Sequence, residues 1–84
     1  MYEVIFQLDI KKYLKKLPKK DAAKILETIA SLSKEPKPRW VEKLNNRIGY
    51  RVRVGNYRII YTVDDGKLII LILDVDHRKD IYRT

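Results

Sequence analysis

Three arginines in the second half of the chain form the clearest candidate for a chemical site. Arg51, Arg53 and Arg58 lie on either side of Gly55-Asn56, a pair typical of a two-residue turn between β-strands. If the two flanking strands pair directly through this turn, Arg53 faces Arg58 and Arg51 lies on the same face of the sheet. Like charges placed directly opposite destabilise a strand pair. The arrangement therefore predicts a site that binds an anion such as phosphate.

A second tight turn, predicted at Asp65-Gly66, brings further polar residues to this site. Pairing through it places Arg58 opposite Leu73, so the chain after Asp76 emerges at the same end of the sheet as the first turn. The residues expected within reach of the arginines are His77, Arg78, Lys79 and Tyr82. His77 is the chain's only histidine and can exchange a proton near neutral pH, because imidazole titrates there.

The periodicity of apolar residues predicts the elements that position these side chains. An alternating pattern predicts a first strand over residues 2–8, and two amphipathic helices follow. The first helix covers residues 10–17 with Asp9 as its N-cap, and the second runs from about residue 19 to residue 32. Three strands are then predicted over residues 50–54, 57–63 and 67–76. We expect an α+β fold in the order β-α-α-β-β-β, with the helical hairpin packed on one face of a small, mainly antiparallel sheet.

Two stretches add detail to this scaffold. The last strand is apolar on both faces through residues 68–73, so we expect it to lie in the interior of the sheet. Residues 39–49 show no clear period, and their structure stays open. We expect Trp40, Val41 and Leu44 to attach that stretch to the core.

Size and composition restrict the class of protein. Eighty-four residues make one domain, 1–84, and the lack of cysteine excludes disulfides and thiolate metal sites. No cluster of metal ligands is visible in the sequence, so we expect neither a metal nor a cofactor. The apolar run 68–73 is far shorter than the roughly 20 residues of a membrane helix, and the N-terminus lacks a signal-peptide pattern. We expect a cytoplasmic protein with no membrane partner.

The net charge of +8 indicates a polyanionic partner, with nucleic acid or the ribosome favoured over a membrane surface. Two segments carry most of this charge. Residues 10–24 hold seven lysines against one aspartate on the predicted helices. Residues 37–58 hold seven basic residues, mostly arginine, against one glutamate. Because the planar guanidinium group suits phosphate, the second segment is the more specific candidate.

The second half of the chain resembles toxins of the RelE/ParE superfamily, and the RelE type in particular. The resemblance rests on the run from Tyr50 to Tyr61, on the Asp65-Gly66 hairpin, and on Val-Asp-His-Arg-Lys-Asp-Ile-Tyr-Arg at residues 75–83. Lys43-Leu44 and the strand–helix–helix start agree with it, so it covers nearly the whole chain.

This resemblance implies the toxin of a type II toxin–antitoxin system. RelE-type toxins are ribosome-dependent endoribonucleases that cleave mRNA in the A site and thereby inhibit translation. The messenger's own 2′-hydroxyl attacks the adjacent phosphorus, which needs no metal.

The resemblance also implies roles for individual residues. Arg51 and Arg53 match basic residues near the attacking hydroxyl, and Arg58 and Arg78 match arginines that hold the phosphate. Tyr82 matches a tyrosine that stacks on a base or orients the hydroxyl. Further contacts with RNA are expected from Lys43, Arg47, Lys79 and Arg83.

The chain departs from the family at the two positions nearest the attacking hydroxyl. The best-known members often carry lysine there, and a lysine with a lowered pKa can act as a base, whereas arginine stays protonated. His77 is the natural substitute. The alternative reading makes His77 an ordinary polar residue at a strand end, with arginine electrostatics carrying much of the rate.

Two other functions stay open at this point. A ParE-like toxin on the same fold would poison DNA gyrase and perform no RNA chemistry, and fold alone does not separate the two. An inactive relative would only bind RNA. The arginines together with His77 and Tyr82 favour RNA cleavage.

The face that carries the arginines also predicts a protein partner. Strand parity places four aliphatic residues beside them: Ile60, Ile69, Leu71 and Leu73. A free monomer should not leave such a patch bare. We expect an acidic cognate antitoxin to cover this face, in addition to the ribosome and mRNA as partners.

Overall fold

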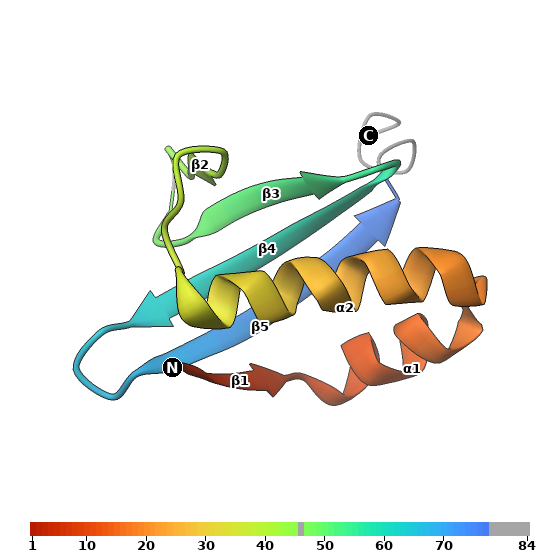
Figure 1. Cartoon of the computed structure of the whole chain (residues 1–84), viewed down its shortest axis with the longest axis horizontal. Coiled ribbons are helices and arrows are strands. Elements are labelled where there is room, and N and C mark those ends of the chain that lie inside the picture. Colours follow the sequence, from red (N-terminus) through yellow and green to blue (C-terminus); the bar gives the residue numbers. More distant parts are fainter. Residues whose placement is uncertain (46, 78–84) are drawn as a thin grey trace.

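The computed structural model describes residues 1–45 and 47–77 of the chain. The elements, drawn in Figure 1, are β1 (Glu3–Phe6), α1 (Leu8–Lys16), α2 (Lys19–Lys34), β2 (Glu42–Lys43), β3 (Tyr50–Val54), β4 (Tyr57–Asp64) and β5 (Ile69–His77). The α+β class and the helical hairpin are confirmed, and the short strand β2 is an addition to the predicted order. Neither helix in the described ranges has the length and apolarity needed to cross a bilayer.

The five strands form one sheet in the order β1-β5-β4-β3-β2. β1 pairs with β5 in parallel, and the other neighbouring pairs are antiparallel. The helical hairpin carries the chain from β1 across one face of the sheet toward β2 at the opposite edge (Figure 1). β5 therefore lies in the interior of the sheet, as its apolar run predicts.

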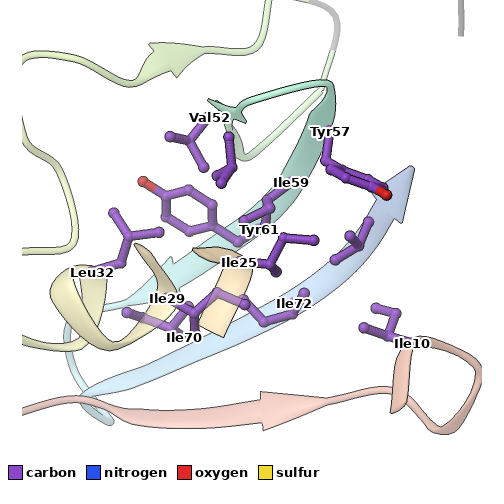
Figure 2. Close-up of a cluster of buried hydrophobic side chains, with 12 residues drawn as sticks. Ile10, Ile25, Ile29, Leu32, Val52, Tyr57, Ile59, Tyr61, Ile70 and Ile72 are labelled. Carbon is purple, nitrogen blue, oxygen red and sulfur yellow. The ribbon is translucent and has the colours of Figure 1, made fainter. Parts of the chain in front are cut away.

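The core fills the space between the helices and the face of the sheet that they cover, which we call the inner face (Figure 2). α2 contributes Ile25, Ile29 and Leu32, which are buried and follow one another at helical spacing. The strands contribute Val52, Val54, Tyr57, Ile59, Tyr61, Ile70, Ile72 and Val75. Burying each large aliphatic side chain contributes roughly 1.5–3 kcal/mol. The inner face therefore holds the domain together.

Tyr61 is the largest fully buried side chain of this core, so its hydroxyl needs a hydrogen-bond partner. The hydroxyl donates to the carbonyl oxygen of Pro36 at 2.7 Å, and the ring stacks on Tyr50 with centroids 5.6 Å apart. Burial raises the pKa of the phenol, which stays protonated. The contact fixes the loop after α2 to the middle of β4.

α1 begins earlier than predicted. It spans Leu8–Lys16 with Gln7 at the N-cap position, so Asp9 lies in the first turn instead of capping the helix. A carboxylate in the first turn still interacts favourably with the helix dipole. Because the helix begins at Leu8, β1 ends at Phe6 and is shorter than the predicted strand over residues 2–8.

The stretch before β3 holds β2 at the edge of the sheet, where Glu42 pairs with Arg51. Val41 packs against the core as expected. Trp40 is 55% exposed, so the expectation that it attaches to the core is wrong. The reason is a tight turn in which the Val41 backbone N–H donates to the carbonyl oxygen of Pro38 at 3.3 Å, leaving Trp40 at the turn's tip.

The β4–β5 connection differs from the predicted two-residue turn. It spans residues 65–68, with Leu68 at φ 57°, so Asp64 pairs with Ile69. A β-bulge then adds one more residue, because Tyr61 pairs with Ile72 while Ile60 pairs with Asp74. Arg58 consequently faces Asp76 and not Leu73. Relative to the predicted pairing of β4 with β5, the longer loop shifts the register by two residues, and the bulge shifts it by one more.

Asp65 holds this loop against two other parts of the chain. Its carboxylate accepts a hydrogen bond from the Tyr2 hydroxyl at 2.6 Å and pairs with the Lys37 ammonium at 2.6 Å. Lys37 and Tyr2 both hold the pKa of Asp65 below its ordinary value. The side chains of Lys37 and Asp65 are largely exposed, so their ion pair orders the loop more than it adds to stability.

Candidate active site

The three arginines lie on the face of the sheet that the helices leave uncovered, which we call the outer face. Arg53 pairs directly with Arg58 across β3 and β4, and Arg51 pairs with Ile60, as the first turn predicts. Gly55 has φ 58°, a left-handed conformation that glycine adopts without strain and that a tight hairpin turn requires. A short glycine turn therefore places the guanidinium groups together.

The guanidinium groups keep donors available. Arg51 forms an ion pair with Glu42 from β2, while within the described part of the chain Arg53 and Arg58 form no ion pair. The Nε atoms of Arg51 and Arg58 are buried, and neither has a hydrogen-bond partner among residues 1–45 and 47–77. A buried N–H without an acceptor costs roughly 1–3 kcal/mol. An incoming phosphate oxygen would supply the missing acceptor, so the geometry suits an anion.

The predicted RNA-binding residues Lys43 and Arg47 lie next to this cluster. Both line a hollow of about 240 Å³ together with Glu42 and Arg51, at the β2 edge of the sheet. The positive charge of the second basic segment is therefore continuous from the sheet edge to the centre of the outer face. Glu42 lies within it, and Arg51, followed by Arg53 and Arg58, holds the pKa of Glu42 below its ordinary value.

The β-bulge decides which side chains of β5 join the arginines. Leu73 is the extra residue, so the alternation of side chains changes at this point. Beyond it, Asp74 lies opposite Ile60 and Asp76 opposite Arg58, on the outer face, while Val75 points into the core. Sequence reasoning missed these carboxylates because it assumed a regular strand. The spacing of Asp74 and Asp76 can be read from the sequence, but the face of the sheet on which they lie cannot.

His77 lies at the predicted end of the sheet but on the inner face. It pairs with Tyr57, and the two rings meet edge to face with centroids 5.2 Å apart. The Tyr57 hydroxyl donates to the Asp21 carboxylate at 2.8 Å, and this bond, with burial, raises the pKa of Tyr57 to about 12. Both rings line a hollow of about 140 Å³ with residues of α2 and the β3–β4 turn. His77 and the arginines are therefore on opposite sides of the sheet.

Asp74 occupies an unusual electrostatic position. The residue as a whole is exposed, but partial burial of its carboxyl group, followed by the neighbouring charge of Asp76, raises the pKa of this group. The Val75 backbone N–H, Arg47 and Arg58 act in the opposite direction and only partly offset this rise. A carboxyl group with a raised pKa beside a set of arginines is a frequent property of functional sites.

The aliphatic residues expected on the outer face are only partly there as predicted. Ile60, Ile69 and Leu71 share the face with the arginines by strand alternation, and Ile60 is buried. Leu73 is the unpaired residue of the bulge. Arg78, Lys79, Tyr82 and Arg83 lie outside the described residues. Within residues 1–45 and 47–77, no group of three or more potential metal ligands occurs.

Comparison with known proteins agrees with this architecture. A family described as the ParE toxin of the type II toxin–antitoxin system parDE matches residues 4–82. Toxin RelG of Mycobacterium tuberculosis is 38% identical over 85 residues, which cover 98% of this chain and 97% of RelG.

Solved structures give the same result. A chain of the toxin–antitoxin complex RelBE2 from M. tuberculosis is 35% identical with a TM-score of 0.78, covering 92% of this chain and 98% of that chain. A chain of the RelE–RelB complex from Pyrococcus horikoshii is 32% identical with a TM-score of 0.78, covering 92% and 94%. The matches extend over nearly all of the sequence and over both layers of the fold. The chain therefore belongs to the RelE/ParE superfamily of toxins from type II toxin–antitoxin systems.

Proposed function

We propose that this toxin is a ribosome-dependent endoribonuclease that cleaves mRNA in the A site and so inhibits translation. One observation carries the proposal above the others: Arg51, Arg53 and Arg58 converge on the outer face, and two of their Nε donors are buried without an acceptor. A phosphodiester is the ligand that these donors suit. Cleavage by the messenger's own 2′-hydroxyl requires no metal.

The reaction assigns distinct tasks to the arginines. The 2′-oxygen attacks phosphorus, the bond from phosphorus to the 5′-oxygen breaks, and negative charge builds up on the non-bridging oxygens. Arg58, with Arg78 from outside the described residues, would bind these oxygens, while Arg51 and Arg53 would lie near the attacking hydroxyl. Donors fixed in place before the reaction stabilise such charge most effectively, because they need no reorganisation.

Proton transfer is a separate part of the proposed mechanism. His77 and Tyr82 are the groups that the sequence proposes for it, with Tyr82 also suited to stacking on a base. His77 packs against Tyr57 on the inner face, so direct contact with a phosphate held by Arg58 would require a change in the last residues of β5. The proposed roles of His77 and Tyr82 in proton transfer are therefore independent of the proposed role of the arginines in binding phosphate.

We also propose a cognate antitoxin as the partner of the outer face. The relative from M. tuberculosis was solved in a toxin–antitoxin complex, and the relative from P. horikoshii in a RelE–RelB complex. An acidic antitoxin would neutralise the arginines and cover the aliphatic residues beside them, such as Ile69 and Leu71. Charge reversal at Arg53, as in Arg53→Glu, should weaken such a complex, whereas charge reversal at Lys15 on α1 should not.

A cleavage assay on programmed ribosomes tests the function. Ribosomes carrying a defined mRNA with an empty A site are incubated with the toxin, and the RNA ends are mapped. We expect a cut within the A-site codon, with a cyclic or 3′-phosphate and a 5′-hydroxyl. DNA breaks that depend on gyrase, without RNA cleavage, would instead support the alternative function of a ParE-like toxin. Binding to ribosomes without either product would indicate an inactive relative.

A further inference from the structure

We propose that Asp74 is the general base of this toxin, accepting the proton of the attacking 2′-hydroxyl on the outer face. This inference rests on the proposed ribonuclease function and names a residue for a step that the arginines cannot perform. Arginine stays protonated in proteins, so a site built from Arg51, Arg53 and Arg58 needs a proton acceptor from another position.

The β-bulge in β5 places Asp74 on the same face of the sheet as the arginines. In a regular strand, Leu73 would lie opposite Ile60 and Asp74 would point toward the helices. The bulge at Leu73 reverses this, so Asp74 lies opposite Ile60, two residues along β4 from Arg58. Bulges occur frequently beside active sites, where they redirect a side chain.

The surroundings of Asp74 contain charges of both signs. Arg58 on β4 and Arg47 in the loop before β3 interact with it favourably, and Asp76 on its own strand interacts unfavourably. On the side of α1, Asp74 lines a hollow of about 270 Å³ together with Asp9, Tyr13 and Asp76. The hollow gives an aqueous route for the proton to leave, while the arginines keep the carboxylate close to where phosphate binds.

Three other titratable groups of the same sheet are less suitable than Asp74 as proton acceptors, namely Glu42, Tyr57 and Tyr61. Glu42 is held in an ion pair with Arg51, and its lowered pKa makes its carboxylate a weak proton acceptor. Tyr57 and Tyr61 belong to the inner face, and both have raised pKa values. Asp74, with its pKa shifted in the opposite direction from that of Glu42, is the stronger base of the two carboxylates.

The step balances without any further reagent except water. The Asp74 carboxylate takes the proton from the 2′-hydroxyl as the bond from the 2′-oxygen to phosphorus forms. The bond from phosphorus to the 5′-oxygen breaks, and the 5′-oxygen takes a proton from a water molecule. Asp74 then releases its proton to solvent. The products are a 2′,3′-cyclic phosphate and a 5′-hydroxyl.

Asp74 should also make the fold slightly less stable, which gives a test independent of catalysis. Because its pKa is higher in the folded chain than in the unfolded chain, ionisation at neutral pH is unfavourable for folding. Asp74→Asn should therefore raise the denaturation midpoint at pH 7. The gain should shrink as pH falls through the pKa of the folded chain, and it should vanish below the ordinary aspartate pKa of 3.8, where the carboxyl group is protonated in both states.

Single-turnover cleavage on programmed ribosomes, measured from pH 8 down to the lowest pH at which the ribosomes stay intact, tests the chemical role. The wild type should lose rate as Asp74 is protonated at acidic pH. Asp74→Asn should lose about a hundredfold in rate at pH 7, together with this acidic limb, since general bases typically contribute 10²–10⁴-fold. Asp74→Glu should recover part of the rate.

Asp76→Asn is the matched control, a carboxylate on the same strand and face. It should keep the plateau rate and move the acidic limb to lower pH, because Asp76 raises the pKa of Asp74. If the wild type cleaves and Asp74→Asn cleaves at the same rate with the same pH profile, Asp74 is not the base, although the ribonuclease function stands. If the wild type cleaves no RNA on ribosomes at any pH, the proposed function fails and this inference fails with it.

Discussion

The inner and outer faces of the sheet are built from the same strands but differ in how completely their groups are satisfied. On the inner face, β4 contributes Ile59 and Tyr61, which are fully buried, and the Tyr61 hydroxyl has its acceptor. On the outer face, the same strand contributes Arg58, whose Nε is buried without one. One strand with alternating residues can therefore contribute to a core whose polar groups are hydrogen-bonded and to a surface whose buried donors gain an acceptor only from a ligand. Changes on the two faces should have separable consequences for folding and for activity.

The largest effect on stability should come from the inner face. Ile72 is fully buried between β1 and β4, and Ile72→Ala should destabilise the domain by about 2–5 kcal/mol, because it removes apolar contacts and leaves a cavity. The measurement is denaturant unfolding followed by circular dichroism. Ile72→Val should cost only about 0.5–1.5 kcal/mol. A loss below 1 kcal/mol for the alanine variant would mean that the inner face is not the main source of stability.

The corresponding change on the outer face should affect activity. Arg58→Ala should reduce cleavage on ribosomes by about two to three powers of ten, since one contact to transition-state charge is typically worth that much. Its unfolding midpoint should not fall, because the buried Nε that lacks an acceptor is removed with the side chain. Lys15→Ala on α1 is the control for general charge. If both variants have equal and small effects, the arginines only attract RNA through their general positive charge and do not bind the reacting phosphate.

A smaller effect is expected at the contact that joins the loop after α2 to the sheet. Tyr61→Phe removes the hydroxyl that donates to Pro36 and leaves a carbonyl oxygen without its partner, at a cost of about 1 kcal/mol. Tyr50→Phe, in the ring stacked on Tyr61, is the control and should cost less. Cleavage activity should stay the same in both variants. A change in rate without a change in stability would contradict the division between the two faces.

The smallest expected effect concerns His77. Its ring packs against Tyr57 on the inner face, so His77→Gln should lower the single-turnover rate by less than about tenfold, a factor worth about 1.4 kcal/mol. The acidic limb of the pH profile should remain if Asp74 accepts the proton. A His77→Gln variant that loses both the limb and most of its rate would return the role of base to the histidine. The two faces would then not be separate in function.

The reliability of sequence reasoning differed between the two hairpins for a physical reason. Gly55-Asn56 closes a two-residue turn, so counting outward from it gives the observed register of the arginines. The second connection contains Leu68 at φ 57°, a conformation that a leucine rarely adopts and that no pattern of residue types announces. The bulge opposite Ile60 and Tyr61 has no sequence signal either. The error in register therefore grew from two residues to three along β5.

The same difference explains which parts of the candidate site were predicted. Periodicity identified the helices and the strands, because burial of one face forces a regular spacing of apolar residues. It also identified Arg51, Arg53 and Arg58, because the pairing of β3 with β4 does not involve the bulge in β5. It did not identify Asp74 as a neighbour of Arg58, and it placed His77 near the arginines, because both conclusions depend on the parity of β5 beyond Leu73.

The bulge also has a consequence for how such toxins diversify. A substitution in β5 changes one side chain, whereas a strand of the same length that pairs without the bulge exchanges the sets of side chains that its last part presents to each face. Two homologous chains could then align residue for residue and still offer different groups to RNA. Such an exchange would turn Val75 out of the core and Asp74 toward the helices, while the pairing of Arg53 with Arg58 would stay the same.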